Sequence, residues 1–520
     1  MIKHLQELLS IESVANHGEN GTPYGVGPAK ALEYMLTLCE QLGFRTKNAD
    51  GRYGYAEIGE GKEIIGVLGH LDVVPAGSGW DYPPFAGTVD NGRLYGRGAL
   101  DDKGPMLISV YAAHDLAREY AEKGKTMNKR IRLIFGQTEE NGDWYDMDAY
   151  VAEEEKVSYG FTPDGDFPAI YCEKGILVMD WVLPQNGSGL RSGEGGIAPN
   201  VVPDSCSVVT EDGAAYETTG KTGHGSAPWN GVNAITAMMK LLAEKNIPVA
   251  KAYMALMGED VYGEALGIAC ASAASGRLSV NAGMLRVEND TVRFTVDIRY
   301  PEDQDADALV ETIRRAVAAY GFVIPPVHPM RPVYLDKKGA VMQQLLKAYR
   351  DETGDLSEPL AIGGGTYARA MDHIIAFGPN FPGEENREHQ GNEYITLNNM
   401  ERLRRIYREA LRNLLEMAEK NRVRLSRRTL FFNMRKGKKM LDKTLQDEIV
   451  KKGRGFLRGV DLSDPIGAAF VSDQELRLPQ PPLVKAAAAT PETHIRLPEP
   501  ESTPLAENDL TELLRSRRSC

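Results

Sequence analysis

Strand-like and helical patterns alternate along residues 1–178, and this alternation limits the possible folds more than any other feature. The patterns lie, in chain order, at 26–43 (helix), 53–58 and 63–69 (strands), 106–116 (helix, after Gly104 and Pro105) and 130–136 (strand). A βαβ rhythm of this kind is typical of an α/β domain, in which helices cover a sheet of mainly parallel strands.

Residues 179–332 have a different pattern, which is that of an α+β domain. Apolar strands are expected at 178–183, 206–209, 291–299 and 322–324, and helices at 232–242 and 305–320. The α/β rhythm then resumes with a helix at 339–353, a strand at 374–378 and a long helix at 397–420. We therefore expect a catalytic domain (1–178 and 333–420) interrupted by an inserted lid domain (179–332), followed by a basic linker and low-order tail (421–520).

His70 and Asp72 close the apolar run that begins at Ile64. Side chains alternate along a strand, so positions 70 and 72 point the same way. A neutral imidazole can bind a metal ion through one nitrogen while a carboxylate holds its other N–H. Two solvated polar residues at a strand end are the alternative, and further acidic and histidine residues downstream favour the metal site.

Asp101 follows a glycine-rich turn and leads into the expected helix, where its two oxygens could bridge two cations. Helix capping is the alternative role. Glu139 and Glu140 follow the strand at 130–136, and adjacent residues at a strand end face opposite ways. One of the two carboxylates can therefore bind metal while the other remains a free base, although such pairs are often only solvated.

Asp164 follows a short apolar strand, and His389 lies in a polar loop far downstream. Each is weak evidence alone. Together with His70, Asp101 and Glu140 they form a nitrogen and oxygen ligand set suited to two Zn²⁺, Mn²⁺ or Co²⁺ ions.

These motifs resemble the M20 family of di-metal peptidases and deacylases over roughly residues 1–418. Further segments are similar to the PepV- and Sapep-like dipeptidases of that family. They begin at Trp80 (WDYPPF), Phe161 (FTPDGDFP), Glu173 (EKG), Gly363 (GGGTYAR) and Phe377 (FGPNFP).

The resemblance implies a role for each matching residue. His70 and Asp164 would hold one metal ion, Glu140 and His389 the other, and Asp101 would bridge both. Asp72 would orient His70, and Glu139 would be the general base that takes a proton from a metal-bridging water. Within the family, aspartate at the position of Asp164 goes with peptidases of short peptides, so the resemblance favours a dipeptidase.

The lid contributes His224, Asn200 and Arg299 to the same resemblance. His224 would stabilise the developing oxyanion, and the other two would bind the carboxylate or carbonyl of the substrate. Gly364, Gly365 and Thr366 match a loop that contacts substrate, where backbone N–H groups could hold the peptide C-terminus. The lid is shorter than in the known dipeptidases, which leaves both a monomer and a homodimer open.

Composition excludes several other classes of protein. The net charge of −13 argues against nucleic-acid binding, and no apolar stretch has the length of a membrane span. Five cysteines without a CxxC pair indicate reduced thiols rather than a disulfide framework. We therefore expect a soluble cytoplasmic enzyme that acts on dipeptides with two divalent cations, Zn²⁺ first and Mn²⁺ or Co²⁺ next.

The segment after Lys420 differs in composition. Residues 422–439 contain eight Arg or Lys and no acid, and residues 479–504 contain seven prolines, so an extended tail is expected. Residues 440–520 resemble the start of a SagB-type nitroreductase, but nearly all of a flavin site would be missing, so no FMN is expected. The segment after Lys420 has two interpretations. It is either a fragment of a joined reading frame or a basic linker to a partner-binding segment.

Two other functions compete with the dipeptidase. An M20-type deacylase of N-acyl amino acids is the nearer alternative, and Asp164 and the glycine-rich loop argue against it. A catalytically silent binding or scaffold protein is the other, and its sign would be the loss of a metal ligand or of the base. All six of these residues are present.

Overall fold

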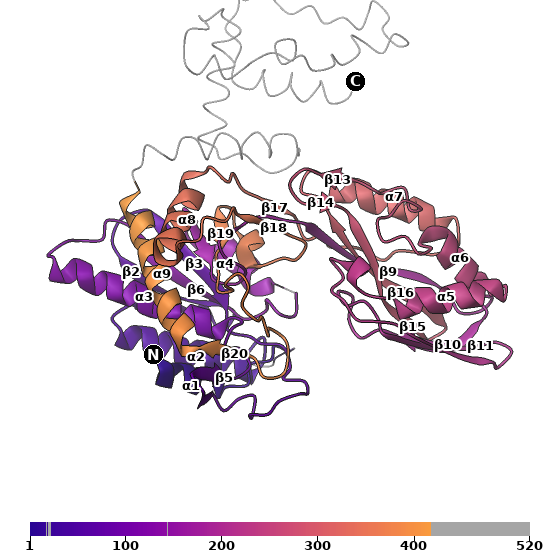
Figure 1. Ribbon diagram of the computed structural model, residues 1–520, viewed down its shortest axis with the longest axis horizontal. Coiled ribbons are helices and arrows are strands. Elements are labelled where there is room, and N and C mark those ends of the chain that lie inside the picture. Colours follow the sequence, from indigo (N-terminus) through magenta and orange to yellow (C-terminus); the bar gives the residue numbers. More distant parts are fainter. Residues whose placement is uncertain (17, 19–21, 143, 418–520) are drawn as a thin grey trace, which may run out of the picture. The chain divides into compact units, whose positions relative to one another are not determined.

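The computed structural model describes residues 1–16, 18, 22–142 and 144–417, and Figure 1 gives the labels of their helices and strands. These described residues belong to a single compact unit. The expectations for residues 421–520, namely the tail, the nitroreductase-like segment and the missing flavin site, lie outside the described residues.

A nine-stranded mixed sheet forms the first core. Its main path runs β1-β2-β6-β3-β7-β19-β8-β17, and β18 pairs with β8. The central pairs β6-β3, β3-β7 and β7-β19 are parallel, whereas the pairs towards β1 and β17 are antiparallel. The strands are β1 (Arg45–Asn48), β2 (Gly54–Gly59), β3 (Ile64–His70), β6 (Arg130–Gly136), β7 (Tyr159–Thr162), β8 (Ile170–Glu173), β17 (Val333–Tyr334), β18 (Leu360–Ile362) and β19 (Ile374–Ala376).

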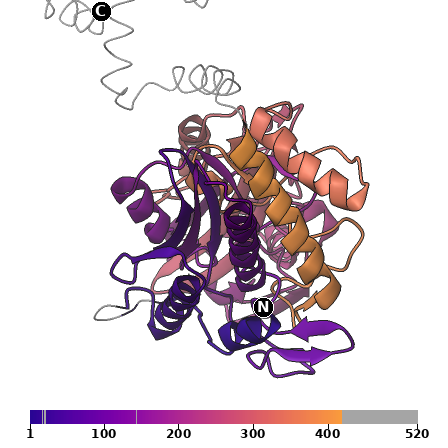
Figure 2. The same cartoon turned by 90° about the vertical axis from the view of Figure 1, so that its left-hand side faces the viewer.

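Helices cover both faces of this sheet. Side chains alternate along its buried strands, so successive apolar residues are buried against helices on opposite faces. Ile65 and Val67 of β3 pack into the core that α3, α8 and α9 share, whereas Ile64 and Leu68 face Met147 of α4. Figure 2 shows α9 between α3 and α8. The helices are α1 (Ile2–Leu9), α2 (Val26–Gln41), α3 (Lys103–Glu122), α4 (Tyr145–Glu153), α8 (Ala340–Thr353) and α9 (Leu397–Glu416). The expected α/β fold class is confirmed.

Glycine allows β3 and β7 to approach closely at the centre of the sheet. A Cβ atom at Gly160 would lie 1.8 Å from the carbonyl oxygen of Gly66. Any larger residue at position 160 would push apart two of the strands that end at the site described below. A small three-stranded sheet lies beside this core: β4 (Thr88–Asp90), β5 (Arg93–Tyr95) and β20 (Tyr394–Thr396).

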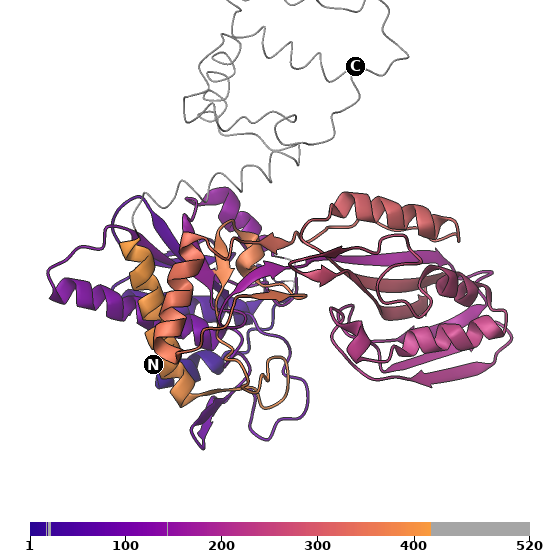
Figure 3. The same ribbon diagram turned by 45° about the horizontal axis from the view of Figure 1, so that its top comes forward.

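A second, six-stranded sheet has the order β12-β11-β10-β15-β16-β9 and is antiparallel throughout. Three helices share its hydrophobic core, and Figure 3 shows α5 and α7 lying along its strands. The elements are β9 (Gly175–Pro184), β10 (Leu190–Gly195), β11 (Ser205–Thr210), β12 (Ala215–Thr219), β15 (Ser279–Glu288), β16 (Thr291–Tyr300), α5 (Ala234–Glu244), α6 (Pro248–Leu256) and α7 (Ala306–Ala318).

The amphipathic pattern explains why α7 forms where it does. Asp305 caps its first turn by accepting the backbone N–H of Ala308, and Leu309, Ile313 and Val317 are buried along one stripe. The remaining short elements are the hairpin strands β13 (Ala271–Ser272) and β14 (Gly276–Arg277) and the 3₁₀ turns η1 (Pro228–Asn230) and η2 (Tyr367–Ala370).

Two details differ from the sequence-based expectations. The strand expected at 322–324 is reduced to a single bridge between Val323 and Val182, on the edge of β9 that does not pair with β16. Helix α3 begins at Lys103, before Pro105, since a proline in the first turn lacks only an N–H that would be unpaired anyway. Within the described ranges, no helix combines the length and the apolar character needed to cross a bilayer.

Candidate active site

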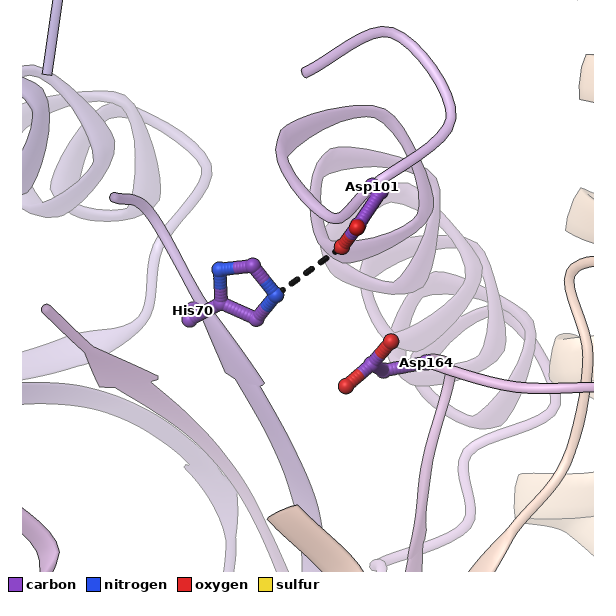
Figure 4. Close-up of side chains that lie close together, drawn as sticks. All are labelled: His70, Asp101 and Asp164. Carbon is purple, nitrogen blue, oxygen red and sulfur yellow. Dashed lines mark hydrogen bonds and ion pairs between the residues drawn. The ribbon is translucent and has the colours of Figure 1, made fainter. Parts of the chain in front are cut away.

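His70, Asp101 and Asp164 come together at the carboxyl ends of the central parallel strands. His70 is the last residue of β3, Asp101 precedes α3 and Asp164 follows β7. The Nε2 atom of His70, which is fully buried, lies 3.0 Å from Oδ1 of Asp101, and Figure 4 shows Asp164 facing both side chains. Parallel strands bring these positions together because their carboxyl ends meet at one edge of the sheet.

A second group of possible ligands shares Asp101 with the first. The Nε2 atom of His389 lies 2.8 Å from Oδ2 of Asp101 and 3.1 Å from Oε2 of Glu140. In each group, His70–Asp101–Asp164 and Asp101–Glu140–His389, the ligand atoms lie within 4.8 Å of one another. The two oxygens of Asp101 therefore face one histidine each, which is the arrangement expected of a bridging carboxylate.

Asp72 holds both His70 and the loop that carries the glutamate pair. The Nδ1 atom of His70 lies 3.0 Å from the carbonyl oxygen of Asp72 and 3.4 Å from its carboxylate. The two oxygens of that carboxylate also accept the backbone N–H groups of Glu139 and Glu140, at 3.4 and 3.1 Å. Asp72 therefore contacts the imidazole through its backbone carbonyl and its carboxylate, and the carboxylate also holds the start of the Glu139–Glu140 loop.

Glu139 belongs to neither ligand group. The indole N–H of Trp144 donates to its backbone carbonyl at 3.2 Å, which holds the loop from the other side. Glu139 thus lies next to a ligand, Glu140, while its own carboxylate stays outside both groups.

Negative charge is concentrated in this site. Burial raises the pKa of Glu139 and of Asp164 well above the usual carboxyl range, and neighbouring carboxylates raise both further. Burial alone would lower the pKa of His389, but hydrogen bonds to Asp101 and Glu140 raise it to about 12. Burial would likewise lower the pKa of His70, but hydrogen bonds to Asp101 and Asp72 hold it well above its ordinary value. Raised pKa values of this kind are what an excess of buried negative charge produces, and positive charge bound in the site would offset it.

Two divalent cations fit this set of donors. Imidazole nitrogen and carboxylate oxygen are the ligands that Zn²⁺, Mn²⁺ and Co²⁺ accept. The buried Oε1 atom of Glu140 has no hydrogen-bond partner among the described residues, which leaves it available as a further ligand atom. His70, Asp101 and Asp164 would hold one ion, and Asp101, Glu140 and His389 the other.

The glycine-rich loop at 363–366 is fixed from two sides. The buried carboxylate of Glu173 accepts the backbone N–H and hydroxyl of Thr366, at 3.2 and 2.7 Å, and pairs with Arg369 at 3.0 Å. From the second sheet, Arg299 donates to the carbonyl oxygen of Gly363 at 3.1 Å. The carbonyl of Gly364 accepts from Arg369 at 3.0 Å, and a Cβ atom at Gly365 would lie 2.2 Å from the same guanidinium.

Arg299, His224 and Asn200 lie together on the inserted segment. Asp297 binds the guanidinium of Arg299 through two bonds of 2.8 Å, which hold it in one orientation. His224 is bridged to Val201, and the carbonyl of Asn200 accepts the N–H of Gly225 at 2.7 Å. Desolvation and the nearby Arg299 lower the pKa of His224, and His389 lowers it further. In the part of the chain that the structure describes, these three side chains make no hydrogen bond to the candidate metal ligands.

Asp146 and Tyr367 were not predicted from the sequence to lie near this site. Asp146 is buried at the start of α4, where it accepts the backbone N–H groups of Gln137 and Thr138 and the hydroxyl of Tyr367 at 2.7 Å. The ring of Tyr367 packs edge-on against His70, with centroids 5.9 Å apart. An acid in the first helical turn normally indicates only a favourable helix end, so no sequence signal distinguished Asp146.

Comparison with known proteins identifies a family and several relatives of this chain. The model of "Peptidase family M20/M25/M40" matches residues 66–413. A relative named "Putative dipeptidase SH1171", from Staphylococcus haemolyticus, is 35% identical over 460 residues, covering 80% of this chain and 97% of the relative. A protein of the corresponding name from Staphylococcus saprophyticus is 34% identical over 458 residues, with the same coverage.

Solved structures share the fold at low sequence identity. An M20 family metallo-carboxypeptidase from Sulfolobus solfataricus superposes with a TM-score of 0.54 at 18% identity, covering 80% of this chain and 99% of that one. The dipeptidase Dug1p of Saccharomyces cerevisiae gives 0.54 at 15%, and human carnosine dipeptidase 1 gives 0.52 at 16%. Each covers 80% of this chain and 96% of the other.

Proposed function

The chain belongs to peptidase family M20/M25/M40 and is a metallopeptidase, and from that premise we propose that it is a dipeptidase that works with two divalent cations. One observation carries the proposal: two ligand groups share Asp101, while Glu139 lies beside them and outside both. A free carboxylate next to a pair of cations is the arrangement that hydrolysis of an amide bond requires. The names of the relatives support the dipeptide as substrate.

The two cations that His70, Asp101, Glu140, Asp164 and His389 would hold would supply Lewis acidity towards the scissile carbonyl and a water molecule. Glu139 accepts the proton of the attacking water and passes it to the leaving amine. Asp72 keeps this base in place, because its carboxylate accepts the N–H groups of Glu139 and Glu140. His224 donates to the oxyanion that develops on the scissile carbonyl.

Arg299 recognises the free carboxylate at the C-terminus of the substrate. Its planar guanidinium suits a carboxylate, and the bond to Gly363 places it next to the loop of Gly364, Gly365 and Thr366. Asn200 and the N–H groups of that loop complete the binding of the terminal residue. Zn²⁺ is the first choice for both ions, and Mn²⁺ or Co²⁺ would fit the same donors.

Comparing an Xaa-Ala dipeptide with N-acetyl-alanine tests this function. The metal-loaded protein is expected to cleave the dipeptide and to leave the acetyl compound intact. Cleavage of the acetyl compound alone would assign the chain to the deacylases instead. Cleavage of neither compound by protein that holds two ions would remove the catalytic proposal altogether.

Replacing Arg299 by lysine is expected to raise the KM for dipeptides about ten- to a hundredfold, with a smaller change in kcat. Lysine keeps the positive charge but cannot bind the carboxylate of the substrate through two nitrogen atoms. Hydrogen bonds to charged groups contribute about 1.5–3 kcal/mol. Steady-state kinetics measures both constants. Arg293→Lys is the matched control on the same strand, because Arg293 is 46% exposed and lies 3.7 Å from Asp180. An unchanged KM in Arg299→Lys would contradict the role.

A further inference from the structure

Glu393 is a fully buried carboxylate four residues after His389. One of its oxygens, Oε1, accepts three backbone N–H groups from the turn that leads into α3. The distances are 3.0 Å from Gly98, 2.9 Å from Leu100 and 3.2 Å from Asp101. A single side chain from the loop of one metal ligand therefore holds the backbone of the bridging ligand.

The second oxygen of Glu393 is occupied by Arg97. Their ion pair measures 2.6 Å, and both side chains are at most 1% exposed. Arg97 also donates to the carbonyl oxygens of Pro75 and Ala76, at 3.4 and 3.1 Å, in the segment that follows Asp72. The pair thus joins three segments of the catalytic core, each of which carries a residue of the proposed centre.

The backbone around this pair is built for the contact. The N–H of Gly96 donates to the backbone carbonyl of Glu393 at 3.0 Å, and the pairing continues through Tyr95 and Tyr394 of β5 and β20. Gly98 has a φ of +89°, and a Cβ atom there would lie 3.0 Å from both Lys103 and Val73. Glycine at this position lets the turn present its N–H groups to one acceptor.

We propose that Glu393 is a positioning residue that keeps Asp101 and His389 at the separation that cation binding requires. This inference rests on the proposed function, because it presupposes that the two ligand groups hold ions. The groups that Glu393 contacts in the turn before α3 are buried. Water therefore cannot replace the hydrogen bonds that are lost when the side chain of Glu393 is changed. Residues that hold the ligands of a metal site typically influence metal affinity ten- to a hundredfold.

The test is a titration of metal-stripped full-length protein with Co²⁺, followed by absorbance and calorimetry. In Glu393→Gln the amide NH₂ must face either Arg97 or the row of N–H groups, so the turn has to shift. We expect at least one of the two Co²⁺ equivalents to bind tenfold or more weakly. Glu385→Gln is the matched control in the same loop, since Glu385 is half exposed and pairs only with Arg387 and Tyr394 among the described residues.

Two results would overturn the proposal. The first is a Glu393→Gln protein with a native near-UV circular dichroism spectrum and both Co²⁺ affinities within twofold of wild type. The second needs no variant and applies even if that protein does not fold: rapid hydrogen exchange of the Gly98, Leu100 and Asp101 amides in the metal-free wild type. Wild-type protein that bound no Co²⁺ would instead refute the proposed function, so the two failures are distinguishable.

Discussion

Replacing Glu139 by glutamine is expected to lower kcat for dipeptide hydrolysis about a thousandfold while leaving both cations bound. A general base contributes roughly 10²–10⁴ to the rate, and glutamine cannot accept the proton of the attacking water. Glutamine has the size of glutamate, and the backbone N–H that holds the loop to Asp72 remains. Steady-state kinetics with metal analysis of the same sample measures both quantities.

Glu140→Gln is the matched comparison, because the two glutamates are neighbours on one loop and only Glu140 belongs to a ligand group. That substitution should weaken metal binding, and part of the lost activity should return at high metal concentration. A Glu139→Gln protein that lost a metal ion, or that kept full activity, would show that the roles of the two glutamates are reversed or shared.

Replacing Asp101 by asparagine is expected to have the second largest effect. Its two oxygens lie 3.0 and 2.8 Å from the two histidines, so it is the only residue common to both ligand groups of the described chain. An amide offers one neutral oxygen and cannot bridge two ions in the same way. We expect no more than one ion per chain and a loss of activity of roughly a thousandfold or more, since each ion contributes several kcal/mol to catalysis.

Metal content and circular dichroism separate this effect from misfolding. Asp166→Asn serves as the control, because Asp166 lies two residues beyond the ligand Asp164 and belongs to neither group. An Asp101→Asn protein that retained two tightly bound ions would contradict the bridging role.

The fold was predictable where periodicity was strong. The run from Ile64 to His70 is buried along its whole length as β3, and the long apolar stripe at 397–416 is α9. Short or bridged segments were not predictable, as Val323 shows. Residues 322–324 have the composition of a strand, but whether they form a ladder or one bridge depends on contacts with distant residues, here with Val182 on the free edge of β9.

The candidate site was predictable to the extent that its residues stand at strand ends. His70, Asp101, Glu140, Asp164 and His389 are polar residues next to apolar runs or in loops, and the structure brings all five together. Glu393, Asp146 and Glu173 were missed as positioning residues. Their function lies in the backbone N–H groups that they accept from remote segments, and a sequence does not show which carboxylates are buried.

The central claim is that two cations at a centre bridged by Asp101 allow this chain to hydrolyse dipeptides. Its most direct test is the activity of metal-stripped protein towards an Xaa-Ala dipeptide as Zn²⁺ or Mn²⁺ is added stepwise. We expect negligible hydrolysis without metal and a rise that is complete at two equivalents per chain. Full activity in the stripped protein, or a rise complete at one equivalent, would contradict it.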